Sequence, residues 1–174
     1  MGMVRGTTSE RGDEHLMVMG GSFQIAAPIQ RVWTALFDIP TMTGWVPGVS
    51  GARRIDEKHY HVSIEQRVAF LTARFEAALE LQEVEAPHRI GFTLEGKDGR
   101  MASSVKVRTT LSLREVDPQR TEIVYENDMS VFGRLGSIGF SAIKRKAKEI
   151  EEEFARRANA ALTEESGGGA SATV

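Results

Sequence analysis

Histidine and acidic side chains are the first candidates for chemistry in this sequence. His59 and His61 form an H-x-H motif, and Glu65 follows on the same face of the segment. Imidazole nitrogens and carboxylate oxygens are common zinc ligands, so this spacing is compatible with a metal site. The intervening residues are apolar and take the inward face of a strand, because successive side chains point to opposite sides: Tyr60, Val62 and Ile64. We therefore expect the histidines to face solvent and to bind no metal.

A hydrolytic active site needs a nucleophile, a base and an orienting acid that converge in one cavity. None of the positions that we predict to face inward supplies a histidine, a glutamate or an aspartate. The sequence contains no cysteine, which excludes disulfides, thiolate zinc sites and cysteine nucleophiles. We therefore expect neither catalytic residues nor a cofactor.

Length and charge narrow the class of protein. The 174 residues fit one domain, and a domain of this size buries roughly 70% of the surface of its unfolded chain. Lysine and arginine number 22 against 24 acidic residues, so the chain lacks the basic excess that drives binding to nucleic acid. The first residues have no apolar core of the signal-peptide type, and no apolar run approaches the ~20 residues of a membrane-spanning helix. We expect a cytoplasmic protein that binds no nucleic acid and that can still contact the inner face of a membrane.

The two ends differ in composition from the middle of the chain. Residues 1–14 contain Gly, Thr, Ser and charged residues without periodicity, and residues 163–174 have the Gly- and Ser-rich composition of a linker. Such segments bury too little apolar surface to offset the entropy lost on ordering them. We predict a disordered N-terminal tail, one domain over residues 15–162 and a flexible C-terminal tail.

Hydrophobic periodicity in the middle predicts strands and helices in a definite order. A first strand ends near residue 25, Pro28 starts a helix, and an apolar stripe over residues 143–161 predicts a long terminal helix. Between them, five segments carry apolar residues at every second position: residues 60–64, 75–81, 90–94, 105–113 and 123–131. Turn signals separate several of these segments, as in an antiparallel meander. A long amphipathic helix is the natural cover for the apolar face of such a sheet, so we predict an α+β fold.

Five stretches in this order carry a family resemblance: PIQRVWTALFD, VPGV, TARFEAALELQEVEAPHRI, TEIVYENDMSVFGRLGSIG and EFARRANAAL. Together they resemble the family of the carbon monoxide dehydrogenase G-subunit, within the START and polyketide-cyclase-like helix-grip superfamily. The resemblance covers about residues 19–162. It implies a curved antiparallel sheet wrapped around a long C-terminal helix, with two short helices after the first strand and an apolar cavity inside.

The resemblance also implies a function. It suggests a non-catalytic accessory protein of a carbon monoxide dehydrogenase-type molybdenum hydroxylase, which binds a hydrophobic ligand, a lipid or quinone, and assists membrane association. Many functions share this fold, so two alternatives stay open. One is a polyketide cyclase/dehydrase-like enzyme, and the other is a structural docking module whose cavity is filled by its own side chains.

The candidate ligand-binding residues are the inward positions of the central strands and the start of the long helix: Phe75, Phe92, Val107, Tyr125, Asn127, Met129 and Ile138. Asn127 is an amide among apolar neighbours, and burying it without a hydrogen-bond partner costs about 1–3 kcal/mol. Its partner is either Tyr125, the backbone or water, or else a ligand carbonyl such as a quinone oxygen.

The stretch GWVPGV at residues 44–49 combines turn residues with a large apolar side chain. Pro-Gly favours a turn at the surface, where a tryptophan is difficult to bury. The resemblance places this stretch between the helical pair and the second strand, near the entrance of the cavity. Two arrangements are open: Trp45, Val46 and Pro47 form a gate, or Trp45 folds back onto Trp33 and Phe37 as core.

In helix-grip domains two hairpin tips and the entry to the long helix lie around one opening. Here these three segments combine apolar and basic residues: Phe70, Leu71, Met101, Phe132, Lys97, Arg100 and Arg134. Apolar residues framed by basic ones suit the surface of an anionic bilayer, and an apolar rim also suits a partner enzyme. We expect this rim to contact a membrane or the partner.

Overall fold

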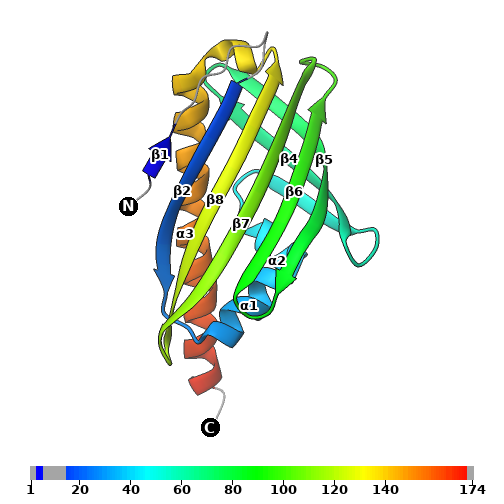
Figure 1. Cartoon of the computed structure of the whole chain (residues 1–174). Helices are drawn as coiled ribbons and strands as arrows, with labels where there is room; N and C mark the ends of the chain where they lie inside the picture. Colours follow the sequence, from blue (N-terminus) through cyan, green and yellow to red (C-terminus); the bar gives the residue numbers. More distant parts are fainter. Residues whose placement is uncertain (1–2, 6–14, 172–174) are drawn as a thin grey trace.

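The computed structural model describes residues 3–5 and 15–171. Its main element is an eight-stranded antiparallel sheet with the strand order β1-β2-β8-β7-β6-β5-β4-β3 (Figure 1). The strands are β1 (Met3–Arg5), β2 (His15–Ile25), β3 (Val49–Arg54), β4 (His59–Val68), β5 (Leu71–Glu85), β6 (Arg89–Asp98), β7 (Ser103–Asp117) and β8 (Arg120–Gly133). From β4 to β8, each strand pairs with the next one in the chain through a short turn, which is the predicted meander.

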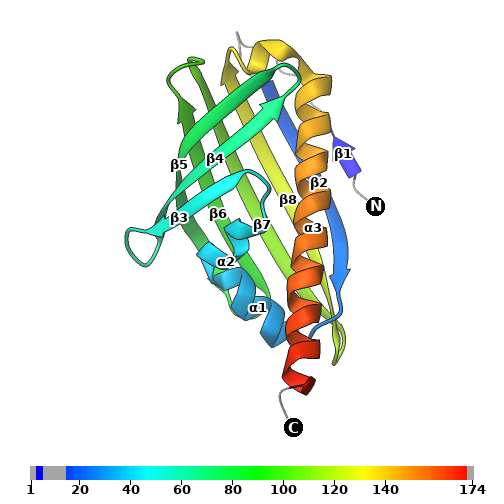
Figure 2. The ribbon, with the colours of Figure 1, turned by 180° about the vertical axis from the view of Figure 1, so that it is seen from behind.

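The helices all lie on one side of this sheet, as the two opposite views show (Figures 1 and 2). They are α1 (Ile29–Phe37), α2 (Ile39–Gly44), the 3-10 turn η1 (Gly136–Ile138) and α3 (Phe140–Ser171). The sheet curves so far that α3 contacts both β2 and β4, although β8, β7, β6 and β5 lie between those two strands. The predicted architecture, a curved sheet around a long C-terminal helix with two short helices after the first long strand, is confirmed.

The α1 helix begins where the sequence predicts. Pro28 occupies the N-cap position with a φ of -62°, and its missing N–H costs nothing there. Ile29, Val32 and Leu36 recur at helical spacing and are all buried. The apolar stripe therefore fixes the face that α1 turns toward the sheet.

The ends of the described chain differ from the expectation of unstructured tails. Residues 3–5 form the short strand β1 on the edge of β2, and the backbone of α3 continues to Ser171, beyond the boundary expected at residue 162. The edge strand β2 offers unpaired backbone groups to which a short segment can add as a further strand. A helix that is already packed gains one hydrogen bond for each residue added, so it can continue into residues with low helix propensity. Residues 1–2, 6–14 and 172–174 lie outside the described residues.

Strand β3 has no counterpart among the alternating segments predicted above. Its burial does not alternate, because it is an edge strand and its register shifts between Val49 and Gly51. Period-two patterning marks a strand only when one whole face is buried. The pattern therefore missed the strand that begins at Val49, the last residue of the GWVPGV stretch.

Two apolar clusters pack opposite ends of α3. The first joins α1, α2 and the sheet to the later part of α3, including Ala158 and Leu162. The second joins the hairpin tips to the first turns of α3, including Ile143 and Ala147. The part of α3 between these clusters faces the concave side of the sheet without a continuous layer of core, and this is where the candidate site lies.

Candidate functional site

An apolar cavity of about 280 Å³ lies between the concave face of the sheet, α3 and the loop that joins α2 to β3. Its walls come from the central strands, from the middle of α3, and from Val46 and Val49 at the two ends of the turn in that loop. Phe92, Leu94 and Val107 face inward by alternation and yet are only half-buried, as expected of side chains that border an open space. A cavity of this size is at the lower end of those that hold small molecules.

The structure places most of the predicted ligand-binding residues around this cavity. They are Phe75, Phe92, Val107, Tyr125, Asn127, Met129 and Val46. Ile138 does not line it, because it lies in η1 and packs on the second apolar cluster, while Leu135 and Ile143 take the cavity-facing positions. Pro47 lies outside the lining as well, although its carbonyl oxygen helps to fix the loop.

Trp45 is a core residue rather than part of the cavity wall. Its side chain is 8% exposed and belongs to the first apolar cluster. The indole packs edge-on against Phe154, with 5.9 Å between ring centroids, whereas Trp33 and Phe37 stack on each other. The core arrangement of Trp45 is therefore the one found, but with Phe154 as its aromatic partner. Because Phe154 lines the cavity, Trp45 supports the wall from behind.

The loop between α2 and β3 is tied to β4. The Gln66 amide donates a hydrogen bond to the Pro47 carbonyl oxygen at 2.6 Å, and the Glu65 N–H donates to the Gly48 carbonyl oxygen at 2.8 Å. Gly48 has a φ of +88°, and a Cβ atom there would lie 2.1 Å from the Glu65 carbonyl oxygen. Only glycine fits this approach, so the turn residues of GWVPGV press the loop onto the strand as a fixed wall.

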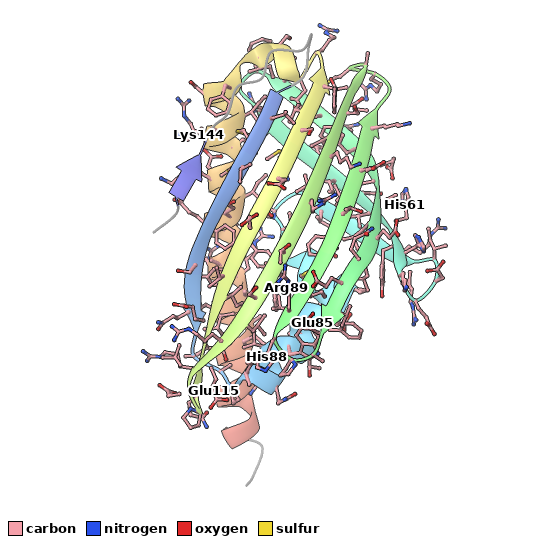
Figure 3. All side chains as sticks on the ribbon, in the orientation of Figure 1. His61, Glu85, His88, Arg89, Glu115 and Lys144 are labelled. Carbon is pink, nitrogen blue, oxygen red and sulfur yellow. The ribbon has the colours of Figure 1, made fainter. Side chains whose placement is uncertain are left out.

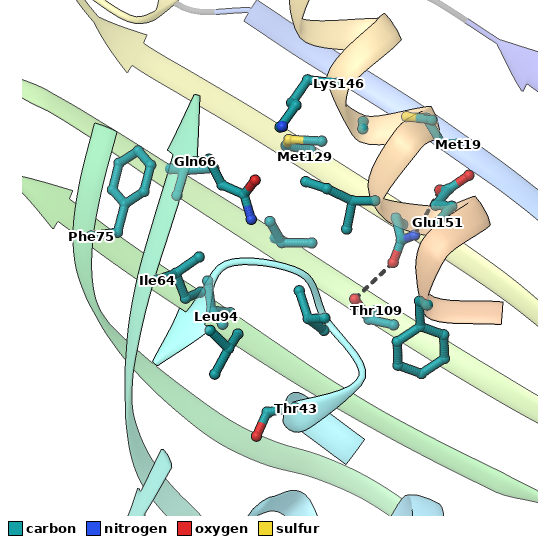
Figure 4. A pocket seen from close by; sticks show the side chains of 18 of the residues that line it. Met19, Thr43, Ile64, Gln66, Phe75, Leu94, Thr109, Met129, Lys146 and Glu151 are labelled. Carbon is teal, nitrogen blue, oxygen red and sulfur yellow. Dashed lines mark hydrogen bonds between the residues drawn. The ribbon is translucent and has the colours of Figure 1, made fainter. Parts of the chain in front are cut away.

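Four hydrogen-bonded polar side chains cross the mainly apolar cavity, and we call them the polar cluster: Thr109, Tyr125, Asn127 and Glu151. The Thr109 hydroxyl donates to the Asn127 amide oxygen at 2.7 Å, and the Asn127 amide nitrogen donates to Glu151 Oε1 at 3.1 Å (Figure 4). The Tyr125 hydroxyl donates to Glu151 Oε2 at 3.0 Å. Each oxygen of the Glu151 carboxylate therefore accepts one hydrogen bond from β8.

Sheet register explains how these groups meet. Thr109 on β7 pairs directly with Asn127 on β8, and Tyr125 lies two residues from Asn127 on the same face. Glu151 reaches the pair from the middle of α3. The cluster thus joins the sheet to the helix across the site.

Burial changes the acidity of two of these groups. It raises the pKa of the Glu151 carboxyl group above its ordinary value of 4.5, although the hydrogen bonds from Asn127 and Tyr125 act in the opposite direction. Burial, and then the negative charge of Glu151, also raises the pKa of the Tyr125 hydroxyl. Tyr125 therefore stays a neutral donor, and Glu151 is a carboxyl group whose charge is poorly solvated.

Glu151 corrects the expectation that no acidic residue faces the cavity. It lies four residues after Ala147 and three before Phe154, both of which line the cavity, so helical spacing alone could have identified it. The predicted stripe instead continued through Ile150. The partners of Asn127 also differ from those expected, because Thr109 and Glu151 satisfy it and Tyr125 binds the same carboxylate.

Gln66 and Lys146 add two polar groups near the loop. Figure 4 shows their side chains extending toward the same space from β4 and from α3. The Gln66 amide is held by the loop, and the Lys146 amine lies 3.8 Å from the exposed Glu149 carboxylate. Long amphipathic side chains of this kind cover apolar surface with their stems and keep their polar ends near water.

The two histidines of the H-x-H motif lie on the outer face of β4, as alternation predicts. His59 contacts the Asp56 carboxylate at 2.8 Å, and His61, visible at the outer edge of the sheet in Figure 3, lies 3.0 Å from the Glu76 carboxylate. Among residues 3–5 and 15–171, no three histidine, cysteine, aspartate or glutamate side chains are grouped as a metal site requires.

The predicted rim lies at one end of the molecule, where the β4–β5 and β6–β7 turns meet the start of α3 (Figure 1). Phe70 is 82% exposed at its turn, and Phe132 is also exposed. Met101 was expected on this rim but is buried at 8% exposure, because it packs beneath the turns in the second cluster, and Leu71 is half-buried there. The basic residues of the rim reach solvent: Lys97, Arg100 and Arg134.

A buried carboxylate holds one of these turns. Asp98 accepts hydrogen bonds from the backbone N–H groups of Arg74 at 2.8 Å, Arg100 at 2.9 Å and Met101 at 3.2 Å. These bonds, the one from Arg74 first, lower the pKa of the Asp98 carboxyl group. The turn that carries Arg100 is therefore fixed to β5.

Comparison with solved structures defines the class of this fold. A conserved protein from Geobacillus kaustophilus aligns with a TM-score of 0.78 at 18% identity, covering 84% of this chain and 95% of the other. A START superfamily protein from Mycobacterium smegmatis gives 0.62 at 13% identity, covering 84% and 97%. The Zhui aromatase/cyclase from Streptomyces sp. R1128 gives 0.56 at 14% identity, covering 83% and 94%. The chain therefore has a START-like helix-grip fold.

The family follows from the sequence. Residues 21–163 match the family model of the carbon monoxide dehydrogenase G-subunit, CoxG, so the chain belongs to that family. A search of curated protein sequences found no match. Within the part of the chain that the structure describes, no helix combines the length and apolar character that crossing a bilayer requires.

Proposed function

We propose that the protein is a non-catalytic accessory module that binds one hydrophobic ligand in the cavity between α3 and the sheet. The observation that carries this proposal is the cavity itself, a mainly apolar space of about 280 Å³ between two well-packed clusters, with the polar cluster in its wall. A protein that needed only stability would fill such a space, because cavities cost packing free energy.

The ligand we propose is a lipid or a quinone, and the partner is a molybdenum hydroxylase of the carbon monoxide dehydrogenase type. Family membership supports the partner, and an apolar wall with a few polar groups supports a long apolar molecule with a small polar end. Such a protein would act in the cytoplasm and contact the inner face of the membrane.

The test is to extract protein purified from a quinone-containing bacterium with organic solvent and to analyse the extract by mass spectrometry. Wild-type protein should release a lipid or a quinone in near-stoichiometric amount. Val107→Phe, which fills the cavity from β7, should lower the yield several-fold. Arg108→Phe, on the outer face of the same strand, is the matched control and should release as much as wild type. Empty wild-type extracts would favour the structural docking module instead.

The exposed rim supports membrane association as part of the same proposal. Phe70 lies among the basic residues of the rim, and each Lys or Arg near an anionic surface contributes roughly 1 kcal/mol. Wild-type protein should sediment with anionic vesicles, and less so as salt rises. Phe70→Ser should abolish this, whereas Ile55→Ser, at a 62%-exposed apolar position on the β3–β4 turn, should not. Binding to the hydroxylase without binding to vesicles would assign the rim to the partner.

Glu151 gives a second candidate, an enzyme of the polyketide cyclase type. A carboxyl group with a raised pKa inside a cavity can serve as a general acid, and one solved structure of similar fold is an aromatase/cyclase. Incubation with polyketide thioesters would test this. Turnover that Glu151→Gln abolishes would establish the enzyme, and absence of turnover with a bound ligand would leave the accessory role.

A further inference from the structure

The polar cluster has more acceptors than donors. Glu151 is the end of the chain, because an ionised carboxylate can only accept, so Asn127 must turn its amide nitrogen toward it and its oxygen toward Thr109. The Thr109 hydroxyl then has to donate, and the Tyr125 hydroxyl donates to the other carboxylate oxygen. The direction of every hydrogen bond in the cluster follows from the charge of Glu151.

A ligand would meet the hydrogen-bonding groups of the polar cluster that its internal bonds leave unused. Both hydroxyl protons are used, and Asn127 keeps one N–H beyond its bond to Glu151. Each carboxylate oxygen of Glu151 keeps a free lone pair, and the oxygens of Thr109, Tyr125 and Asn127 also keep acceptor capacity. A molecule that reaches the polar cluster therefore meets mainly acceptors, and a polar group without a proton to donate would leave them unsatisfied. The amine of Lys146, which also lines the cavity, is a donor outside the cluster and lies 3.8 Å from the Glu149 carboxylate.

The surroundings of the cluster favour an aromatic ligand. The Phe23 ring lies 6.2 Å from the ring of Tyr125 and 6.3 Å from that of Phe154, and all three residues line the cavity beside Glu151. Aromatic rings pack well against such walls in edge-to-face or offset geometry.

We propose that Glu151 determines the specificity of the cavity by accepting a hydrogen bond from a phenol-type hydroxyl of the ligand, so that the protein selects hydroxylated aromatic molecules over those with only carbonyl or ether oxygens. This rests on the proposed ligand-binding function and names its ligand class. Of the two states of a quinone, the cavity would prefer the reduced one, which carries hydroxyl groups.

The test uses two probes of nearly equal size, 2-naphthol and 2-methoxynaphthalene, of which only the first donates a hydrogen bond. Their affinities are measured by equilibrium dialysis at a pH of about 8, well above the ordinary range of a carboxyl group. Wild-type protein should bind 2-naphthol about tenfold more tightly than its methyl ether, since hydrogen bonds to charged groups are the stronger ones.

Three variants locate this preference. Glu151→Gln should lose it, because the carboxamide brings N–H donors where the carboxylate had only acceptors. Tyr125→Phe frees one more acceptor site on Glu151 and should keep or increase the preference, which a purely structural role for the cluster would not produce. Glu126→Gln removes an equal charge from the exposed outer face of β8 and should behave as wild type. Thermal unfolding confirms that each variant is folded.

The outcomes distinguish ligand binding by the cavity from ligand selection by Glu151. If wild-type protein binds neither probe, both the ligand-binding function and the selectivity are wrong. If it binds both with equal affinity, or if Glu151→Gln keeps the preference for 2-naphthol, the cavity binds ligands but Glu151 does not select them.

Discussion

Replacing Trp45 by alanine tests whether the GWVPGV stretch is core or a gate. The indole is 8% exposed and packs on Phe154. A tryptophan buries ~150–250 Å², which at ~25 cal/mol per Å² corresponds to about 4–6 kcal/mol of transfer free energy. Alanine retains a small part of this, so Trp45→Ala should lower the free energy of unfolding by about 3–5 kcal/mol.

Urea unfolding followed by far-ultraviolet circular dichroism measures this loss without depending on tryptophan fluorescence. Phe37→Ala is the control, because Phe37 stacks on Trp33 but is about half exposed, and it should cost about 1 kcal/mol. A gate would give the opposite result for Trp45→Ala, namely a loss below about 1 kcal/mol together with faster exchange of bound ligand. That result would refute the packing argument.

Three further predictions concern the loop, the rim and the cavity. Gly48→Ala should lower the free energy of unfolding, measured in urea, by about 1–3 kcal/mol, because the φ of Gly48 is +88° and a Cβ atom there would meet the backbone of β4. Gly44→Ala is the control and should have little effect, since a Cβ atom there would have nothing within 4 Å. Equal effects of the two substitutions would contradict the interpretation of the loop as a fixed wall. Asp98→Asn should cost about 1–3 kcal/mol, since an amide cannot accept all three backbone bonds, while Asp117→Asn, which accepts one bond in an exposed turn, should cost less. Glu151 should make the free energy of unfolding depend on pH. The pKa of its carboxyl group is raised above 4.5 in the folded state, so between 4.5 and the raised pKa the folded protein binds more protons than the unfolded chain. The free energy of unfolding therefore falls as the pH rises through this window. The stability of Glu151→Gln relative to wild type should therefore increase with pH over this window, and a constant difference would show that the carboxyl group is not perturbed.

Most of the architecture could be predicted because the sequence patterns that indicate it lie within single strands and helices. Period-two alternation marks strands with one buried face, and the start of α1 at Pro28 depends on the chemistry of a single residue. Strand β3 could not be predicted in this way, since an edge strand with a register shift buries no complete face. Residues 163–171 were assigned to a tail on composition, yet the helix continues through them, because propagation from a packed helix needs little support from the sequence.

The site was predicted less completely than the fold. Alternation identified the inward residues of the strands, including Val107 and Asn127, because the side-chain period of a strand leaves no choice of face. Which apolar residues border the cavity and which fill the core depends on where α3 and the loop pack against the sheet. For that reason Trp45 and Met101 could not be placed from sequence, and both turned out to be buried.

Keeping the Glu151 carboxylate in the cavity wall lowers the stability of the folded protein. Its burial raises the pKa of the carboxyl group even though two hydrogen bonds lower it, so the ionised group is less stable here than in water. Replacing such a group by an apolar residue of similar size is often neutral or stabilising in a protein interior. A helix that supplied only packing would carry leucine at this position, just as it carries Ile143 and Ile150 elsewhere on the cavity wall. Because β7 and β8 supply three hydrogen-bonding groups that together orient this one carboxylate, the arrangement is better explained by a ligand that needs an acceptor than by the stability of the fold.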